Sequence, residues 1–260
     1  MRTDHVGVAL LCTSLLVSAC RTTAVAPVPS APAAPPRLAA TRFVAYGDSI
    51  TEGFVQRCPT TTVDDARALR IGFVFAQGRA QPSPTAYPAK LEEMLAARYP
   101  SQTITVVNEG LGGEDIQGGV ANLPRVLTTN MPQVLLLQEG VNTINQNHRE
   151  GIPLVVDGLR TMIQEARSRS ITVFAATLLP QRAGGCRAYD YEEGFDDIIE
   201  ANVQIRRMIG TQGAVLVDLY EAFNGRTAML IGEDGLHPSA LGYERIAETF
   251  FAAIKRYLEE

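Results

Sequence analysis

The sequence contains no tryptophan, only three histidines and no cluster of basic residues. Its 28 acidic and 23 basic residues give a formal net charge of −5. Nucleic-acid-binding proteins concentrate Lys and Arg on one face, because the phosphate backbone dominates their affinity. The composition therefore predicts no nucleic-acid partner. A hydrophobic content of 46% in 260 residues is enough for one globular domain with a sizeable core.

The chain also lacks an apolar run long enough to span a bilayer. Its longest apolar stretch, "VGVALLCTSLLVSA" at residues 6–19, is shorter than the run of about 20 residues that a membrane-spanning helix needs. The stretch ends in "LVSAC" and resembles a bacterial lipoprotein signal, in which Cys20 is lipidated and becomes the first mature residue. An ordinary secretory signal cleaved nearby is the alternative, which stays open because Asp4 is atypical in the N-terminal region of a lipoprotein signal. Either reading predicts export, and the first predicts a lipid anchor in the membrane of the bacterial cell envelope, on the periplasmic or surface side.

Acidic residues are missing from the segment that follows the signal. Residues 20–41 are rich in proline and alanine, and such a composition stays extended because it cannot build a core. We expect three parts: a signal peptide at 1–19, a tether at 20–41 and a folded domain at 42–260.

Cysteine is scarce, and only Cys58 and Cys186 remain beyond the proposed lipidation site. In an exported protein two such cysteines are candidates for a disulfide, with two free, buried thiols as the alternative. They are too few and too far apart in sequence to suggest a zinc site. The sequence thus predicts no metal centre.

From residue 42 onward, short apolar runs alternate with longer segments of helical periodicity. The predicted strands lie at 42–47, 103–108, 132–138, 171–177 and 214–219. The predicted helices lie at 86–100, 117–128, 152–169, 195–210 and 239–260. This order predicts an α/β fold, a three-layer α/β/α sandwich around a mostly parallel five-stranded sheet. Two segments, 56–85 and 181–194, do not fit the alternation.

In a parallel sheet, functional residues gather where the strands end at their carboxyl edge. Ser49 follows the first predicted strand, so its hydroxyl is a candidate nucleophile. A serine hydroxyl needs a neighbouring base, usually a histidine that is oriented by an acid. In "GEDGLHP", Asp234 precedes His237 by three residues, a spacing that lets a tight turn bring the two side chains together. The other remaining histidine, His148, has only Glu150 nearby and suits a solvated polar loop.

Two further loops can supply hydrogen-bond donors for an oxyanion. "NEGLGG" follows the second strand, and its glycines leave backbone N–H groups unobstructed. "QEGVN" follows the third strand and ends on Asn142, whose side-chain amide can donate. Donors placed in advance beside a carbonyl that gains negative charge lower the barrier to acyl transfer.

Together these segments resemble the SGNH or GDSL hydrolase family. "YGDSITEG", "NEGLGG", "EGVN" and "DGLHP" are similar, in this order, to the four sequence blocks of that family. The resemblance covers about residues 42–258 and implies a flavodoxin-like arrangement of the sheet. One departure is Thr143, which stands where many members carry an acid after the asparagine. The chain also lacks the G-x-S-x-G elbow of α/β-hydrolases.

The resemblance implies a catalytic triad of Ser49, Asp234 and His237. It implies an oxyanion hole formed by the Ser49 N–H group, the Asn142 amide and the N–H group of Gly113, with Gly112 as the alternative register. The expected activity is that of a serine esterase, which hydrolyses acyl or acetyl esters through an acyl-enzyme without a cofactor. The substrate is then an acetylated glycan or a lipid acyl ester. The alternative function is a non-catalytic surface lipoprotein that binds a glycan or a partner on the same fold.

Overall fold

A computed structural model describes residues 1, 35–55, 85–185 and 195–260 of the chain. The chain divides into the units Met1–Ala34 and Pro35–Glu260, and only the second is described at length below. Of the first unit, the structure describes Met1 alone. The predicted signal peptide, the lipidation site Cys20 and both cysteines of the predicted disulfide, Cys58 and Cys186, lie outside the described residues.

Five parallel strands form one sheet in the order β2-β1-β3-β4-β5. They are β1 (Arg42–Gly47), β2 (Thr105–Gly110), β3 (Val134–Gln138), β4 (Thr172–Ala176) and β5 (Val215–Val217). All five residues of the central strand β3 are buried, as expected for a parallel strand covered on both faces. The predicted parallel sheet and its flavodoxin-like order are confirmed.

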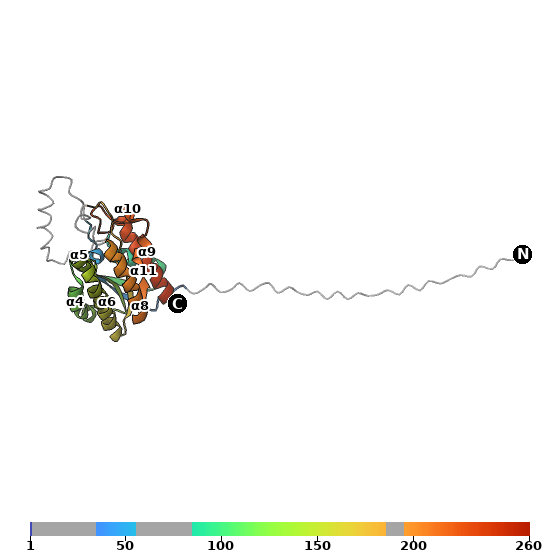
Figure 1. The fold of residues 1–260 in the computed structure, drawn as a ribbon. Coiled ribbons are helices and arrows are strands. Elements are labelled where there is room, and N and C mark those ends of the chain that lie inside the picture. The colour runs from blue at the N-terminus through green and yellow to red at the C-terminus, as the bar shows by residue number, and fades with distance from the viewer. Residues whose placement is uncertain (2–34, 56–84, 186–194) are drawn as a thin grey trace. The chain divides into compact units, whose positions relative to one another are not determined.

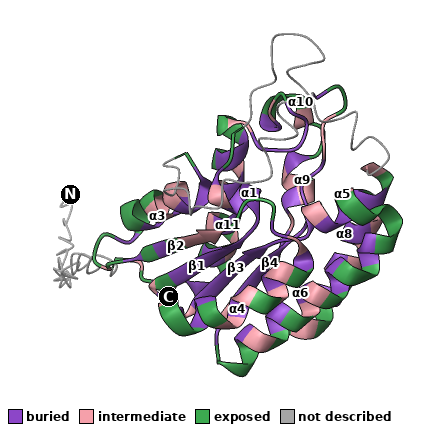
Figure 2. Ribbon diagram, turned by 90° about the vertical axis from the view of Figure 1, so that its left-hand side faces the viewer, coloured by how far each residue is buried: buried purple, intermediate pink, exposed green. Residues whose placement is uncertain are grey.

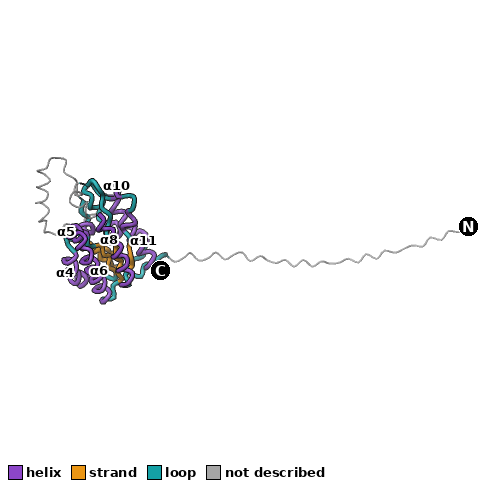
Figure 3. The backbone as a smooth tube through the Cα atoms, viewed as in Figure 1, coloured by secondary structure: helices purple, strands orange, loops and turns teal. Residues whose placement is uncertain are grey.

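Helices cover both faces of the sheet and complete the three-layer α/β/α fold (Figures 1 and 2). On one face α4 (Ile116–Asn130) packs against α6 (Gly151–Ser168), which packs against α8 (Phe195–Gln212). On the other face α3 (Tyr87–Arg98) packs against α11 (Ala240–Leu258). Figure 3 shows the strands in orange, enclosed by these helices. Among the described residues, no helix combines the length and apolarity that crossing a membrane requires.

Short helices occupy several segments that follow strands. These are α1 (Ser49–Glu52), α5 (Val141–Asn147), η1 (His148–Glu150), α9 (Leu219–Phe223) and α10 (Thr227–Leu230). The sequence patterns did not predict them, because one or two helical turns are too short to show a periodicity. The second strand also begins two residues later than predicted. These differences are confined to the edges and connections of the sheet.

The folded domain begins before residue 42, where the sequence analysis placed its start. Leu38 is buried and pairs with Glu259 in an isolated antiparallel bridge. The side chain of Gln102 holds both backbone groups of Leu38, with distances of 2.8 Å to its nitrogen and 2.9 Å to its oxygen. An extended, proline-rich segment can still pair in this way wherever its N–H groups remain, so composition alone placed the boundary too late.

The strands β1 and β2 both end on a glycine because backbone from a neighbouring element lies against each of these positions. A Cβ atom on Gly47 would lie 1.8 Å from the carbonyl oxygen of Gln138, and one on Gly110 would lie 2.1 Å from the backbone nitrogen of Glu52. Both distances are far below van der Waals contact. The missing side chains thus let α1 lie directly against the ends of the neighbouring strands.

Candidate active site

Ser49 is the first residue of α1 and follows β1 after a single residue. That intervening residue, Asp48, caps the helix by accepting a hydrogen bond from the Ile50 N–H group at 2.9 Å. The cap turns the chain sharply out of the sheet and places Ser49 at the carboxyl edge. The Ser49 residue is only 7% exposed, so its hydroxyl is held in a largely water-excluded position.

Asp234 and His237 lie in the loop before α11, held by a compact set of hydrogen bonds. One Asp234 oxygen, Oδ1, accepts the backbone N–H groups of Leu236 and His237, each at 3.0 Å. Its other oxygen, Oδ2, lies 2.5 Å from His237 Nδ1. Gly235 has a φ of +85°, which favours glycine at this turn. The loop therefore fixes both the carboxylate and one nitrogen of the imidazole ring.

The second imidazole nitrogen faces the serine. His237 Nε2 lies 2.9 Å from Ser49 Oγ, although the two residues are 188 positions apart in the sequence. Asp234 and His237 are almost completely buried, with exposures of 0% and 2%. The structure thus brings the three predicted residues into one hydrogen-bonded chain that runs from carboxylate to imidazole to hydroxyl.

The carboxyl group of Asp234 remains charged despite its burial. Burial alone would raise the pKa of Asp234, but the hydrogen bonds and the charge of His237, with the backbone N–H groups of Leu236 and His237, outweigh it. The net effect is a pKa below the ordinary value. A carboxylate held in this way orients the ring and stabilises it when the ring takes up a proton.

The glycine loop after β2 lies beside Ser49. The Leu111 N–H group donates to the carbonyl oxygen of Gly47 at 2.8 Å and ties the loop to the end of β1. A Cβ atom on Gly112 would lie 3.9 Å from Ser49 Cβ, while Gly113, with a φ of +79°, has open space around it. Within the described part of the chain, no acceptor is found for the N–H groups of Gly112 and Gly113. Both groups are available to a ligand.

Asn142 lies in the first turn of α5, after β3. Its Nδ2 atom donates to the carbonyl oxygen of Glu114 at 2.8 Å, which joins the loop after β3 to the loop after β2. An asparagine amide carries two hydrogens, so the second can be donated elsewhere. The bond to Glu114 fixes the side chain that the sequence predicts as an oxyanion donor.

Comparison with known protein families identifies the family to which the chain belongs. Residues 45–245 match the family described as GDSL-like Lipase/Acylhydrolase. The chain belongs to this family. A comparison with curated protein sequences gives no match.

Solved structures of similar fold include three informative examples. TesA shares 20% sequence identity over 82% of this chain and 98% of its own, with a TM-score of 0.60. Axe2, an acetylxylan esterase from Geobacillus stearothermophilus, shares 19% identity over 82% of this chain and 94% of its own, also with a TM-score of 0.60. A lipolytic G-D-S-L protein from Veillonella parvula DSM 2008 shares 18% identity over 84% and 100%, with a TM-score of 0.59. At these identities the likeness shows a common fold.

The sequence analysis missed two side chains that shape this acylhydrolase site. The Phe54 ring packs against the His237 ring, with their centroids 4.9 Å apart. The Tyr243 hydroxyl donates to the Phe54 carbonyl oxygen at 2.5 Å and links the nucleophile loop, residues 48–55, to α11. No motif marks either residue. The helical periodicity of α11 identifies Tyr243 only as a buried side chain.

His148 does not join the candidate triad. It directly follows α5 as the first residue of η1, its side chain is exposed, and its φ of 51° is unusual for a residue with a side chain. Its side chain forms no hydrogen bond with Ser49, Asp234 or His237. These observations agree with the prediction of a solvated loop histidine.

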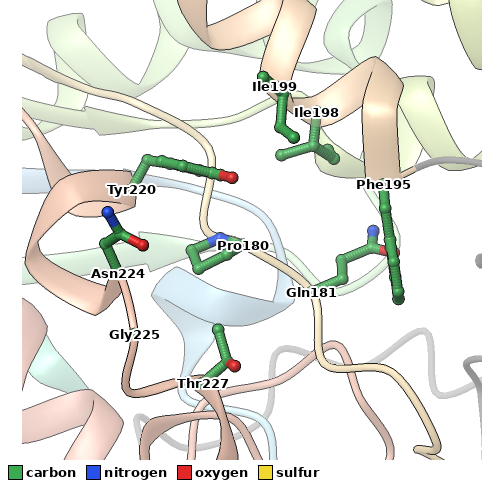
Figure 4. A pocket seen from close by; sticks show the side chains of 9 residues that line it. All are labelled: Pro180, Gln181, Phe195, Ile198, Ile199, Tyr220, Asn224, Gly225 and Thr227. Carbon is green, nitrogen blue, oxygen red and sulfur yellow. The ribbon is translucent and has the colours of Figure 1, made fainter.

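A pocket of about 280 Å³ lies next to the loop that carries Asp234. Figure 4 shows its lining residues: Pro180, Gln181, Phe195, Ile198, Ile199, Tyr220, Asn224, Gly225 and Thr227. Gln181 Nε2 donates to Asn145 Oδ1 at 2.7 Å, and the next residue, Arg182, donates its backbone N–H to the carbonyl oxygen of Gly235 at 2.8 Å. The pocket wall is thereby connected to α5 and to the Asp234 loop. None of the predicted site residues lines the pocket.

The described residues hold no group of three or more His, Cys, Asp or Glu side chains arranged to bind a metal ion. The candidate site is instead composed of a hydroxyl, an imidazole, a carboxylate and amide donors. Such a set supports nucleophilic attack with general acid–base assistance.

Proposed function

We propose that the protein is a serine esterase that hydrolyses carboxylic esters through an acyl-enzyme intermediate. The observation that carries this proposal is the hydrogen-bonded chain from Asp234 through His237 to Ser49, with a distance of 2.9 Å between His237 Nε2 and Ser49 Oγ. Membership of the GDSL-like family supports an ester as the substrate.

The reaction begins when Ser49 Oγ attacks the ester carbonyl carbon as His237 Nε2 takes the hydroxyl proton. Negative charge then gathers on the carbonyl oxygen, where the N–H groups of Ser49 and Gly113 and the Asn142 amide donate hydrogen bonds. The protonated His237 gives its proton to the departing alcohol, leaving the acyl group on Ser49. Water attacks the acyl group as His237 takes one of its protons, and His237 then returns that proton to Ser49 Oγ as the carboxylic acid is released. Asp234 holds the ring in place throughout and stays ionised.

The test is hydrolysis of p-nitrophenyl acetate by matched variants. Ser49→Ala and His237→Ala should each lower kcat at least about 10⁴-fold, because residues of a triad act as a unit. His148→Ala is the matched control and should retain the activity of the unmodified protein. Full activity in the Ser49 or His237 variant would contradict the proposal. The non-catalytic alternative predicts ligand binding without turnover and a Ser49 that does not react with an organophosphonate.

The apolar surface beside the nucleophile favours a substrate with an apolar group. Phe54, Val55 and Leu111 belong to the nucleophile loop and the glycine loop, and they are 37%, 53% and 45% exposed. Exposed apolar side chains around a buried polar centre are typical of a ligand-binding site. An acetylated glycan would instead use this rim to pack a sugar ring, and Axe2 is an acetylxylan esterase of the same fold. Measuring acetate release from acetylated xylan against fatty-acid release from lysophospholipid separates the two substrates.

We further propose that Cys20 carries a lipid that anchors the protein in the bacterial cell envelope. This proposal rests on the sequence alone, on the apolar stretch at 6–19 and the small residues before Cys20. Metabolic labelling with a radioactive fatty acid should mark the wild-type protein and not Cys20→Ala. An unlabelled wild-type protein that is nevertheless exported would indicate ordinary signal cleavage.

A further inference from the structure

Three buried carboxyl groups that take no part in the proposed mechanism lie close enough to act on one another electrostatically. Asp48, Glu139 and Glu114 are 0%, 1% and 7% exposed. Each has one carboxyl oxygen that is buried and has no hydrogen-bond partner among the described residues: Asp48 Oδ2, Glu139 Oε2 and Glu114 Oε2. Burying an ionised carboxylate without partners is costly, so these oxygens require an explanation.

Sheet register brings Asp48 and Glu139 together. β1 and β3 are parallel neighbours, and the last registered pair is Gly47 with Gln138. Asp48 and Glu139 are the next residues of the two chains, and neighbouring strands lie about 4.8 Å apart. By the alternation of side chains along a strand, Asp48 lies on the same face as Tyr46. Glu139 lies on that face as well.

Contacts with α4 support this placement. The Tyr46 hydroxyl donates to the carbonyl oxygen of Gly119 at 2.8 Å. A Cβ atom on Gly119 would lie 3.4 Å from Glu139 Cγ, so the glutamate stem packs on the same turn of α4. Both carboxyl groups are therefore enclosed between the sheet and α4, away from water.

The other oxygen of each carboxyl group is occupied by a backbone donor. Asp48 Oδ1 accepts the Ile50 N–H group at 2.9 Å, and Glu139 Oε1 accepts the Gly140 N–H group at 3.0 Å. The first bond caps the helix that begins with Ser49, and the second lies in the segment that leads to Asn142. Asp48 Oδ2 and Glu139 Oε2 are thus left without a donor among the described residues.

Charged and titratable groups near the pair do not neutralise it. The pKa of Asp48 is raised to about 7, chiefly by burial; the hydrogen bond from the Ile50 N–H group opposes the rise and the charge of Glu114 adds to it. Burial raises the pKa of Glu139 well above its ordinary value, and the charges of Asp48, Glu114 and Asp115 act in the same direction. Tyr46, Tyr87 and Tyr243 are neutral neighbours whose own pKa values are raised, by burial above all. The positive charge of Arg125 acts to lower the pKa of Tyr46 and the pKa of Glu114.

We propose that Asp48 and Glu139 together hold one proton at neutral pH, in a carboxylic acid–carboxylate hydrogen bond that joins the Ser49 loop to the segment carrying Asn142. The O–H group of one carboxyl donates to the free oxygen of the other, so both orphaned oxygens gain a partner. Two neighbouring buried carboxyl groups share a proton, because ionising both would place two like charges close together away from water. Asp48 and Glu139 are thus positioning residues that hold the nucleophile and one oxyanion donor in register.

The kinetic consequence of the Asp48–Glu139 pair rests on the proposed function, the hydrolysis of esters by Ser49. At alkaline pH the pair loses its proton, and a second negative charge appears below the place where the oxyanion forms. That charge disfavours the transition state, so kcat for p-nitrophenyl acetate should fall roughly tenfold between neutral pH and about pH 9 while KM changes little. Glu139→Gln keeps a hydrogen-bond donor and cannot ionise, so its kcat should stay level over this range.

The matched control is Glu93→Gln on the exposed surface of α3, which should follow the wild-type pH profile. Rates measured with Ser49→Ala are subtracted to remove hydrolysis by hydroxide. Superimposable profiles for the wild-type protein, Glu139→Gln and Glu93→Gln would overturn the proposal. Asp48→Asn provides a second test, because its Oδ1 atom can still cap α1.

Infrared spectroscopy tests the shared proton without any activity. Ser49→Ala at neutral pH should show the carbonyl stretching band of a buried carboxylic acid, and the band should disappear when Glu139→Gln or Asp48→Asn is added. Absence of the band in Ser49→Ala would refute the shared proton even if esterase activity is established. If the band disappears as expected but the wild-type protein shows no esterase activity, the shared proton is supported and the proposed function is rejected.

Discussion

Asp234 and Asp48 are two acids of the candidate site, and both are 0% exposed. Asp234 contacts His237, whereas Asp48 directly precedes Ser49 and caps its helix. Asp234 receives three hydrogen bonds, from the backbone of Leu236 and His237 and from the imidazole ring. Asp48 receives one, from Ile50, and its second oxygen is unpartnered among the described residues. Burial raises the pKa of Asp48, whereas for Asp234 the hydrogen bonds outweigh burial and lower it.

Since Asp234 and Asp48 are equally buried, the number of hydrogen-bond donors to each carboxyl group explains why their pKa values shift in opposite directions. A carboxylate that receives several N–H groups keeps its charge in a dry environment, because those groups replace water. A carboxyl with few donors keeps a proton instead. In this protein the charged acid Asp234 contacts the imidazole that must become positive, whereas Asp48, which we propose shares a proton with Glu139, directly precedes the nucleophile Ser49.

Replacing Asp234 should reduce kcat far more than replacing Asp48. Asp234→Asn should lower kcat about 10⁴-fold, because the amide no longer stabilises the protonated His237 or selects its tautomer. Asp48→Asn should change kcat less than about threefold at pH 6, since the wild-type pair already holds a proton there. Both are measured with p-nitrophenyl acetate at saturation, with folding checked by circular dichroism. Equal losses in the two variants would show that the acids do not differ in role.

Much of the fold was predictable because buried strands and long helices leave clear periodic patterns. The apolar run of β3 and the amphipathic pattern of α6 were each located to within about two residues. The boundary at residue 42 was misplaced because the pairing of Leu38 with Glu259 involves opposite ends of the domain. Such a contact depends on tertiary structure and leaves no local pattern.

The candidate site was predictable for a related reason. Parallel strands end at one edge, so Ser49 and Asn142 were expected to approach each other from chain order alone. The partnership of Asp48 with Glu139 was not predicted, because it depends on the exact register of β1 and β3. A one-residue slip would have turned one of the two side chains to the opposite face.

A second prediction compares the two acids through stability. The pKa of Asp48 is raised in the folded protein, so its stabilising contribution is present below the unfolded pKa near 4 and is lost as pH rises to about 7. The side chain of Asp48→Asn cannot ionise, so this variant does not lose stability as the pH rises. It should raise the free energy of unfolding relative to wild type on the order of 2 kcal/mol at pH 8, and much less at pH 4.5.

Urea denaturation at the two pH values measures this difference. Asp234→Asn serves as the comparison and should behave in the opposite way. Its carboxylate has a lowered pKa, so it stabilises the fold above pH 4, and replacing it should destabilise the protein at pH 8. A lower stability of Asp48→Asn at pH 8 would contradict the assigned protonation.

The smallest expected effect concerns Glu114, which has an environment between those of Asp234 and Asp48. Its Oε1 atom accepts from Asn122 Nδ2 at 2.5 Å, and its Oε2 atom has no partner among the described residues. Burial raises the pKa of Glu114, while the Asn122 amide, the Tyr46 side chain and the charge of Arg125 oppose the rise. Asn122→Ala should therefore cost about 1 kcal/mol of unfolding free energy at pH 8 and less at pH 5, where a larger fraction of Glu114 is protonated.

Urea denaturation of Asn122→Ala at these two pH values measures the cost. Gln117→Ala, at an exposed position of the same helix, is the control and should show no dependence on pH. If the cost of Asn122→Ala is the same at both pH values, the amide does not act through the charge of Glu114. In that case the number of donors would not explain why one buried acid near Ser49 is ionised and another holds a proton.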